Sequence, residues 1–194
     1  MSLEIKNLTK SFGKKILFKN FSFSFSDKGV YALMGESGHG KTTLLRLICG
    51  LDADFEGEIV GGGIKNSAIA FQEYRLFPNL SATDNLIFAN HDKKSEKNIF
   101  EAKSLLLQLG FSEEDTELFP DSLSGGMKER VSLARAFLRP AKILLLDEPT
   151  KELDEENAMA VLEKIKEEAK KRLVIIVTHN ENHARLIGAT IVNI

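Results

Sequence analysis

Residues 35–42 have the sequence GESGHGKT, which matches the pattern G-x-x-x-x-G-K-[ST] without a gap. The match directly follows the apolar run Val30-Tyr31-Ala32-Leu33-Met34, and a helix is expected from residue 41 to residue 50. A strand that leads into a glycine-rich turn and then a helix is the context in which this pattern indicates binding of nucleotide phosphates. The glycines allow the backbone to turn its N–H groups inward, and the helix adds the positive end of its dipole at the same place.

The loop and the first turn of the helix are predicted to bind the nucleotide. Lys41 would reach the outer phosphates, and the hydroxyl of Thr42 would coordinate Mg²⁺. His39 occupies a variable position of the pattern, and we assign it no chemistry of its own. The predicted nucleotide-binding residues of this segment are Gly35, Glu36, Ser37, Gly38, His39, Gly40, Lys41, Thr42 and Thr43. Four specified positions match by chance in roughly one sequence of this length per hundred, so the rest of the chain has to support the prediction.

The composition is that of a soluble globular protein with one well-buried core. The chain has 194 residues, of which 43% are hydrophobic and 28% are charged. Its formal net charge of −2 argues against nucleic acid as a partner, because such a surface needs a basic excess. The single cysteine, Cys49, lies in an apolar helical segment and is expected to pack in the core. No apolar run approaches the ~18 residues of a membrane span, and the N-terminus has no apolar secretion signal.

Strands and helices alternate along the chain, which predicts an α/β fold with a mostly parallel core sheet. Strands are expected at residues 3–8, 16–25, 30–34, 58–60, 67–71, 142–146, 173–177 and 190–194. Helices are expected at residues 41–50, 124–138, 155–171 and 180–187, and the pattern between residues 72 and 137 is helical. The three consecutive glycines at 61–63 are expected to form a hairpin turn between the strands on either side, because the sequence after them does not fit a second phosphate loop.

Two carboxylates follow the apolar strand at 142–146. Parallel α/β sheets place their ligands at the carboxyl ends of the strands, which is where Asp147 and Glu148 are expected. Asp147 would hold Mg²⁺ through water, and Glu148 would polarise an attacking water molecule. Taken alone, an apolar run followed by Asp-Glu also fits an ordinary boundary between a strand and a loop. Together with the phosphate loop it indicates hydrolysis of a nucleotide.

The segment Leu123-Ser124-Gly125-Gly126-Met127 resembles the Leu-Ser-Gly-Gly signature with which ABC ATPases begin a helix, and motifs from Phe12 to His179 follow that family's order. The resemblance implies a P-loop NTPase fold in a single domain, residues 1–194, with a mostly parallel core sheet and an antiparallel β lobe. It also implies a helical subdomain inserted at about residues 73–138. The family uses its signature segment to contact the ATP of a second cassette, at a helix N-terminus that suits an anion.

The same five residues have a simpler interpretation, in which a glycine turn precedes a helix that Ser124 caps. Met127 stands where the family most often has Gln. We expect this difference to have a modest effect, because the preceding Ser-Gly-Gly makes the phosphate contacts in the family.

The resemblance implies roles for four further residues. Gln72 is similar to the glutamine that contacts Mg²⁺ and the reactive water, and Asp154 to the aspartate that bridges two cassettes. A helix N-cap is a compatible role for Asp154. His179 is similar to the switch histidine that contacts the γ-phosphate. Phe12 resembles the aromatic residue that stacks on adenine, with packing in the core as the alternative.

The resemblance therefore implies an ATPase of a membrane transporter, in which two ATP molecules close a homodimer or a pair of cassettes. It implies that Glu148, His179, Gln72 and Lys41 are the catalytic residues. The expected partners are integral membrane permease subunits docking near Gln72 and residues 75–78, and an extracytoplasmic substrate-binding protein. The expected location is cytoplasmic and peripheral, on the inner face of the cell membrane. A related ATPase acting on nucleic acid or ribosomes is the alternative. It is disfavoured because the stretch before Leu123 is too short for sustained heptads and the chain has one cassette. The region around Gln72 is similar to nitrate-, sulfonate- and taurine-type importers.

Overall fold

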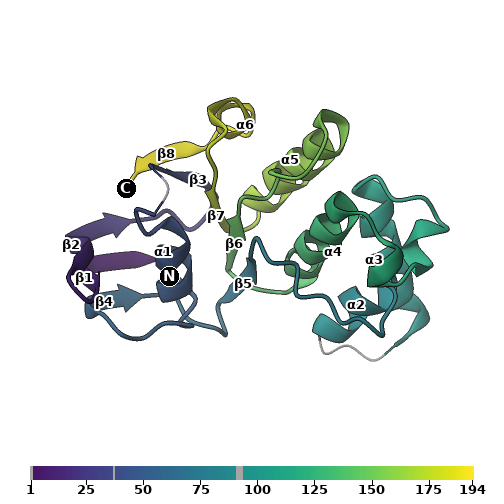
Figure 1. Cartoon of the computed structure of the whole chain (residues 1–194), viewed down its shortest axis with the longest axis horizontal. Helices are drawn as coiled ribbons and strands as arrows, with labels where there is room; N and C mark the ends of the chain where they lie inside the picture. Colours follow the sequence, from purple (N-terminus) through teal and green to yellow (C-terminus); the bar gives the residue numbers. More distant parts are fainter. Residues whose placement is uncertain (1, 37, 91–93) are drawn as a thin grey trace. The chain divides into compact units, whose positions relative to one another are not determined.

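The computed structural model describes residues 2–36, 38–90 and 94–194 (Figure 1). The described chain forms two compact units, which we call the sheet unit and the helical unit. The sheet unit consists of Met1–Ile69, Ala141–Asp147 and Ile165–Ile194, and the helical unit of Ala70–Pro140 and Glu148–Lys164. The helical unit therefore includes residues 148–164 in addition to the segment 73–138 that the sequence indicates. The description of the whole chain as a single domain stays a prediction.

A five-stranded sheet forms the centre of the sheet unit, in the order β5-β6-β7-β3-β8. Its strands are β3 (Gly29–Met34), β5 (Ser67–Ala70), β6 (Ile143–Asp147), β7 (Leu173–Val177) and β8 (Thr190–Asn193). β3 pairs in parallel with β7 and β8, and β6 pairs in parallel with β7. All residues of β6 and β7 are buried, as expected for central strands of a parallel sheet. The predicted parallel sheet is confirmed.

Helix α1 (Lys41–Ile48) starts directly after Gly40 and buries one face in the core of the sheet unit. The residues of that face are Leu44, Leu45, Leu47 and Ile48, which pack in one cluster with Leu33, Leu145 and Ile175. Cys49 is buried in the same cluster, as predicted. The helix ends at Ile48 rather than at the predicted residue 50, because Gly50 has φ of 75°, which no helix residue adopts.

A second sheet in the sheet unit is antiparallel and has the order β2-β1-β4. Its strands are β1 (Glu4–Phe12), β2 (Lys15–Ser24) and β4 (Glu56–Val60). Leu3, Ile5 and Leu8 from this region lie in the same hydrophobic cluster as α1. The two sheets therefore share one core, and the predicted antiparallel lobe is present.

The predicted hairpin at residues 61–63 is wrong. β4 and β5, on either side of the glycines, belong to different sheets. The glycines instead lead the chain past the end of α1, where the N–H of Gly63 donates a hydrogen bond of 2.8 Å to the carbonyl oxygen of Ile48. A Cβ atom on Gly62 would lie 2.4 Å from that same oxygen. The segment needs glycine because two stretches of backbone approach closely, and a turn between paired strands plays no part.

The helical unit contains α2 (Ala82–Ala89), α3 (Glu96–Gln108) and α4 (Gly125–Leu138), which contact one another (Figure 1). Two short 3₁₀ turns, Asp115–Glu117 and Pro120–Ser122, precede α4. Two further helices are α5 (Glu155–Ala169), which continues from the helical unit into the sheet unit, and α6 (Glu181–Leu186) in the sheet unit. None of the helices within the described ranges has the length and hydropathy that crossing a membrane requires.

Candidate functional site

The phosphate loop lies between β3 and α1, at the carboxyl edge of the five-stranded sheet. Lys41, the first residue of α1, is 6% exposed, and its side chain turns back over the loop. Its ammonium donates hydrogen bonds to the carbonyl oxygens of Gly35 at 2.8 Å and Glu36 at 2.9 Å. The positive charge therefore lies within the loop, where phosphate oxygens would need a donor. Ser37, another predicted contact, lies outside the described residues.

The loop is held by contacts that the sequence did not reveal. Lys15, at the start of β2, donates a hydrogen bond of 3.1 Å from Nζ to the carbonyl oxygen of Gly38. A Cβ atom on Gly40 would lie 3.0 Å from the ring of Phe18, and one on Gly35 would lie 2.2 Å from the carbonyl oxygen of Ile194. These two glycines are therefore required by close neighbours as well as by their φ angles of 93° and 152°. Lys15 gave no signal in the sequence, because it lies on a strand remote from the motif.

Asp147 and His179 lie at the same edge of the sheet as the loop. Asp147 ends β6 and is the register partner of Val177, the last residue of β7, and His179 follows two residues later. His179 and Gly35 both line a pocket of about 360 Å³. The other lining residues are Met34, Thr178, Glu181, Ile191 and Asn193. The sheet therefore gathers the phosphate loop, Asp147 and His179 at one edge of a single unit, and their contact with a nucleotide stays a prediction.

Glu148 follows Asp147 directly but has a different backbone conformation. Its φ of 54° lies in the left-handed region, which is uncommon for a residue other than glycine. The N–H of Lys151 donates a hydrogen bond of 3.2 Å to the carbonyl oxygen of Glu148, so the chain turns immediately after the strand. Unfavourable backbone conformations are concentrated at functional sites, which is consistent with the role predicted for this carboxylate.

The signature segment lies in the helical unit, at the start of α4. Ser124 Oγ accepts a hydrogen bond of 3.2 Å from the N–H of Met127, so Ser124 caps the helix, as the simpler interpretation held. A Cβ atom on Gly125 would lie 3.2 Å from the carboxylate of Glu152, and one on Gly126 would lie 3.2 Å from the carbonyl oxygen of Glu152. Leu123 is buried, whereas Ser124 and Gly125 are exposed. The segment therefore presents a polar surface at a helix N-terminus, and its contact with a nucleotide stays a prediction.

Asp154 is the N-cap of α5. Its carboxylate accepts hydrogen bonds from the backbone N–H of Asn157 at 2.9 Å and from the Asn157 side-chain amide at 2.7 Å. These two hydrogen bonds lower the pKa of Asp154, which is therefore ionised at neutral pH. Gln72 follows β5 in the helical unit and is exposed. Thr42 and Thr43 lie in the first turn of α1, with Thr42 exposed to solvent.

Phe12 ends β1 in the sheet unit with 55% of its surface exposed. The alternative that it packs in the core is therefore wrong. The ammonium of Lys10 lies over its ring, 4.8 Å from the ring centre. An exposed ring can stack on a flat ligand, so the adenine contact stays a prediction for Phe12.

Two further titratable residues, Glu129 and Tyr74, were missed by the sequence reasoning. Burial raises the pKa of the Glu129 carboxyl to about 7, with a smaller contribution from the negative charge of Glu152. Burial also raises the pKa of Tyr74 to about 12, aided by its hydrogen bond to Glu152. No motif predicts these contacts, because they join three segments that are far apart in the sequence.

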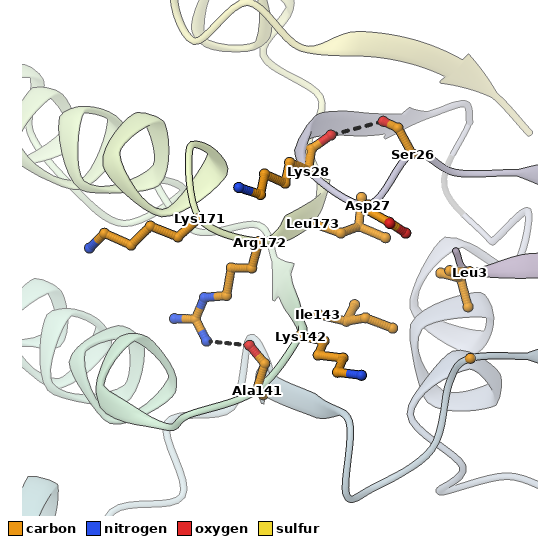
Figure 2. Close-up of a pocket in the computed structure, with 11 residues that line it drawn as sticks. Leu3, Ser26, Asp27, Lys28, Ala141, Lys142, Ile143, Lys171, Arg172 and Leu173 are labelled. Atoms are coloured by element: carbon orange, nitrogen blue, oxygen red, sulfur yellow. Dashed lines mark hydrogen bonds between the residues drawn. The ribbon is translucent and has the colours of Figure 1, made fainter. Parts of the chain in front are cut away.

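A second pocket lies at the opposite edge of the five-stranded sheet, where β3, β6 and β7 begin (Figure 2). It has a volume of about 310 Å³, and Lys28, Lys142 and Arg172 lie on its wall. Arg172 forms an ion pair of 2.8 Å with Glu168 and donates a hydrogen bond of 3.3 Å to the carbonyl oxygen of Ala141. The lining includes none of the predicted nucleotide-binding residues, so the candidate site is the pocket at the carboxyl edge.

Comparison with known proteins gives the class to which this arrangement belongs. The family model described as ABC transporter matches residues 18–151. The chain is 36% identical over 207 residues to the aliphatic sulfonates import ATP-binding protein SsuB of Bacillus cereus (strain ZK / E33L), covering 99% of the chain and 80% of that protein. A solved structure, a dimeric post-hydrolysis state of the ATP-binding cassette MJ0796 bound to ADP and Pi, has a TM-score of 0.86 and 30% identity. That likeness covers 99% of this chain and 94% of the solved one.

The chain therefore belongs to the ABC transporter family, and the family and fold inferred from its motifs are confirmed. It is also 35% identical to the Fe(3+) ions import ATP-binding protein FbpC of Pasteurella multocida (strain Pm70) over 98% of its length, but covers 58% of that protein. It covers 48% of the sulfate/thiosulfate import ATP-binding protein CysA of Acinetobacter baylyi (strain ATCC 33305 / BD413 / ADP1).

Proposed function

We propose that this chain binds and hydrolyses ATP with Mg²⁺, as the nucleotide-binding subunit of a membrane importer. The observation that carries the proposal is the gathering of the Lys41 loop, Asp147 and His179 at one edge of the parallel sheet. Relatives named as import ATP-binding proteins and a related cassette bound to ADP and Pi support the same activity. Phosphoryl transfer to water suits this arrangement, because the protein mainly positions groups and neutralises charge.

Each predicted residue has a defined task in this proposal. Lys41 holds the outer phosphates, Glu148 accepts a proton from the attacking water, and His179 contacts the γ-phosphate. The hydroxyl of Thr42 and the amide oxygen of Gln72, with the carboxylate of Asp147 acting through water, would hold Mg²⁺, which prefers hard oxygen ligands and would neutralise phosphate charge. Phe12 stacks on the adenine ring.

The proposed site is completed by a second cassette. The exposed Ser124, with Gly125 and Gly126 at the start of α4, binds the ATP held by the other copy. Asp154 bridges the two copies. Two identical sites related by a two-fold axis then close on two ATP molecules and open after hydrolysis.

The importer needs a permease, which we place against the segment after Gln72. Phe77 and Phe88 are 39% and 57% exposed, and their rings meet edge to face at 4.7 Å between centres. An exposed aromatic pair is typical of a surface that binds another protein. The cassette would then lie at the inner face of the cell membrane, and an extracytoplasmic protein would deliver the substrate to the permease.

The Glu148→Gln variant tests the proposal, because glutamine keeps the shape of the side chain but cannot accept the proton. It should bind ATP, hydrolyse it far more slowly than the unmodified chain, and elute as a dimer from gel filtration in ATP. Elution only as a monomer would contradict the dimer. Copurification of the unmodified chain with DNA or ribosomes, in place of a hydrophobic multi-span protein, would instead support the soluble ATPase alternative.

A further inference from the structure

Three segments of the helical unit are joined by a closed ring of hydrogen bonds. The Tyr74 hydroxyl donates to the carboxylate of Glu152, and the backbone N–H of Glu152 donates to Glu129 Oε2 at 3.3 Å. The Arg135 guanidinium donates to the carbonyl oxygen of Tyr74 at 3.0 Å. Glu129 and Arg135 both lie on α4, so this helix closes the ring.

The carboxylate of Glu152 has a second neighbour, which is the signature segment. A Cβ atom on Gly125 would lie 3.2 Å from Glu152 Oε2 and 3.8 Å from the Tyr74 hydroxyl oxygen. The hydrogen-bonded pair therefore packs directly against the first residue of α4. A side chain at position 125 would therefore contact this pair.

Each segment in the ring carries a residue with a predicted role. Gln72 lies two residues before Tyr74, Ser124 caps the helix that holds Glu129, and Asp154 lies two residues after Glu152. We propose that the Tyr74–Glu152 hydrogen bond is a positioning link, which fixes the signature segment and the Asp154 turn relative to the Gln72 segment. Tyr74 and Glu152 are positioning residues that act through Gln72, Ser124 and Asp154.

This inference rests on the proposed function, because it concerns the geometry with which the same site hydrolyses ATP. A link of this kind affects the rate of the chemical step more than the binding of ATP, which involves mainly the phosphate loop. A purely structural hydrogen bond would change stability and leave the ratio of kcat to KM unaffected in the folded protein.

The test uses Tyr74→Phe, Glu152→Ala, Glu152→Gln and the double variant Tyr74→Phe/Glu152→Ala, with ATPase kcat and KM measured for each. Tyr74→Phe and Glu152→Ala should each lower kcat by about three- to tenfold with little change in KM, which corresponds to the net contribution of one typical hydrogen bond. Glu152→Gln keeps an acceptor oxygen and should restore most of the rate. The double variant should be no slower than either single variant, because both remove the same hydrogen bond.

Tyr31→Phe is a matched control. The Tyr31 hydroxyl accepts a hydrogen bond of 3.1 Å from the N–H of Ser26 in the sheet unit, so the same chemical change is made outside the ring. Any effect of Tyr31→Phe on kcat should combine independently with that of Glu152→Ala, so that the two factors multiply. Tyrosinate absorbance also reports on the Tyr74–Glu152 hydrogen bond, because the sequence has two tyrosines and no tryptophan. One tyrosine should ionise near pH 12 in the unmodified chain, and the Glu152→Gln variant should lower that value.

Failure of this inference is distinguishable from failure of the proposed function. Absence of ATPase activity in the unmodified chain would overturn the proposed function, and this inference with it. Normal ATPase activity with multiplicative losses in the double variant, or with an unchanged kcat in both single variants, would overturn this inference alone. A tyrosinate titration that Glu152→Gln does not alter would also overturn it.

Discussion

The carboxylate of Glu129 accepts a hydrogen bond from the backbone N–H of Glu152, so two acidic residues meet on one side of α4. Glu129 is 8% exposed, and its burial raises its pKa to about 7. The unfolded chain has an ordinary glutamate at this position, with a pKa of about 4.3. Between these two pKa values the folded protein binds more protons than the unfolded chain, and its stability is linked to pH accordingly.

Glu129→Gln should therefore remove a pH dependence. In the unmodified chain the favourable contribution of a protonated Glu129 is present below the unfolded pKa and is lost as pH rises toward about 7. Between pH 5 and pH 8 the stability of the variant relative to the unmodified chain should rise by about 2–3 kcal/mol. Urea unfolding at the two pH values measures this. The exposed Glu156 on α5 provides the control variant Glu156→Gln, and an equal pH effect in both variants would contradict the assignment.

Replacement of Gly35 by alanine should destabilise the protein by more than the strain of its positive φ angle alone. A Cβ atom at Gly35 would lie 2.2 Å from the carbonyl oxygen of Ile194, whereas one at Gly188 would have nothing within 4 Å. Both glycines have positive φ, so Gly188→Ala carries only the backbone penalty of about 1–2 kcal/mol. Gly35→Ala should cost more in thermal unfolding and should also abolish ATP binding. Equal losses of stability in the two variants would show that the close approach to Ile194 is unimportant.

The two lysines at the loop should contribute unequally to ATP affinity. Lys41 places its buried ammonium within the loop, so Lys41→Ala should weaken ATP binding by roughly 100-fold, or about 2.7 kcal/mol. Lys15 donates to the carbonyl oxygen of Gly38 and is exposed, so Lys15→Ala should weaken ATP binding by about threefold. Titration of a fluorescent ATP analogue measures both. A larger effect at Lys15 would reverse their assignment.

Phe12→Ala should weaken ATP binding by about three- to tenfold, which is the usual contribution of an aromatic contact. Phe12→Tyr should keep the affinity, because stacking needs only a flat aromatic face. Stability should change little, because the ring is exposed. Ile16 is 59% exposed on the neighbouring strand, and Ile16→Ala is the matched control that should leave affinity unchanged. An ATP affinity that Phe12→Ala leaves unchanged would exclude the stacking contact.

The sequence was sufficient to predict the parallel sheet and the edge that carries the phosphate loop. The apolar runs that became β6 and β7 are continuous, and such runs are typical of strands buried on both faces. Because parallel strands end together, the positions of Asp147 and His179 directly after such runs already indicate the edge that carries the Lys41 loop.

The remaining features depend on contacts between distant segments, which no local pattern encodes. The local sequence at residues 61–63 is typical of a hairpin turn. The close approach of Gly62 to the backbone of Ile48, which the sequence does not reveal, explains why glycine is present there instead. Lys15 and Glu152 are ordinary polar residues in the sequence. Their importance comes from Gly38 and Tyr74, which the fold brings to them from far along the chain.

The capping hydrogen bond at Ser124 limits how this position can vary. A hydroxyl that accepts from the N–H of Met127 still has its own proton to donate, so one oxygen atom starts a helix and presents a donor at the same time. At Ser81 and Ser95, which cap α2 and α3, aspartate would serve the helix equally well. At Ser124 aspartate would preserve the fold and repel a phosphate. If Ser124 binds phosphate as proposed, the caps of α2 and α3 should therefore accept aspartate, whereas the cap of α4 should require a residue that keeps a hydroxyl.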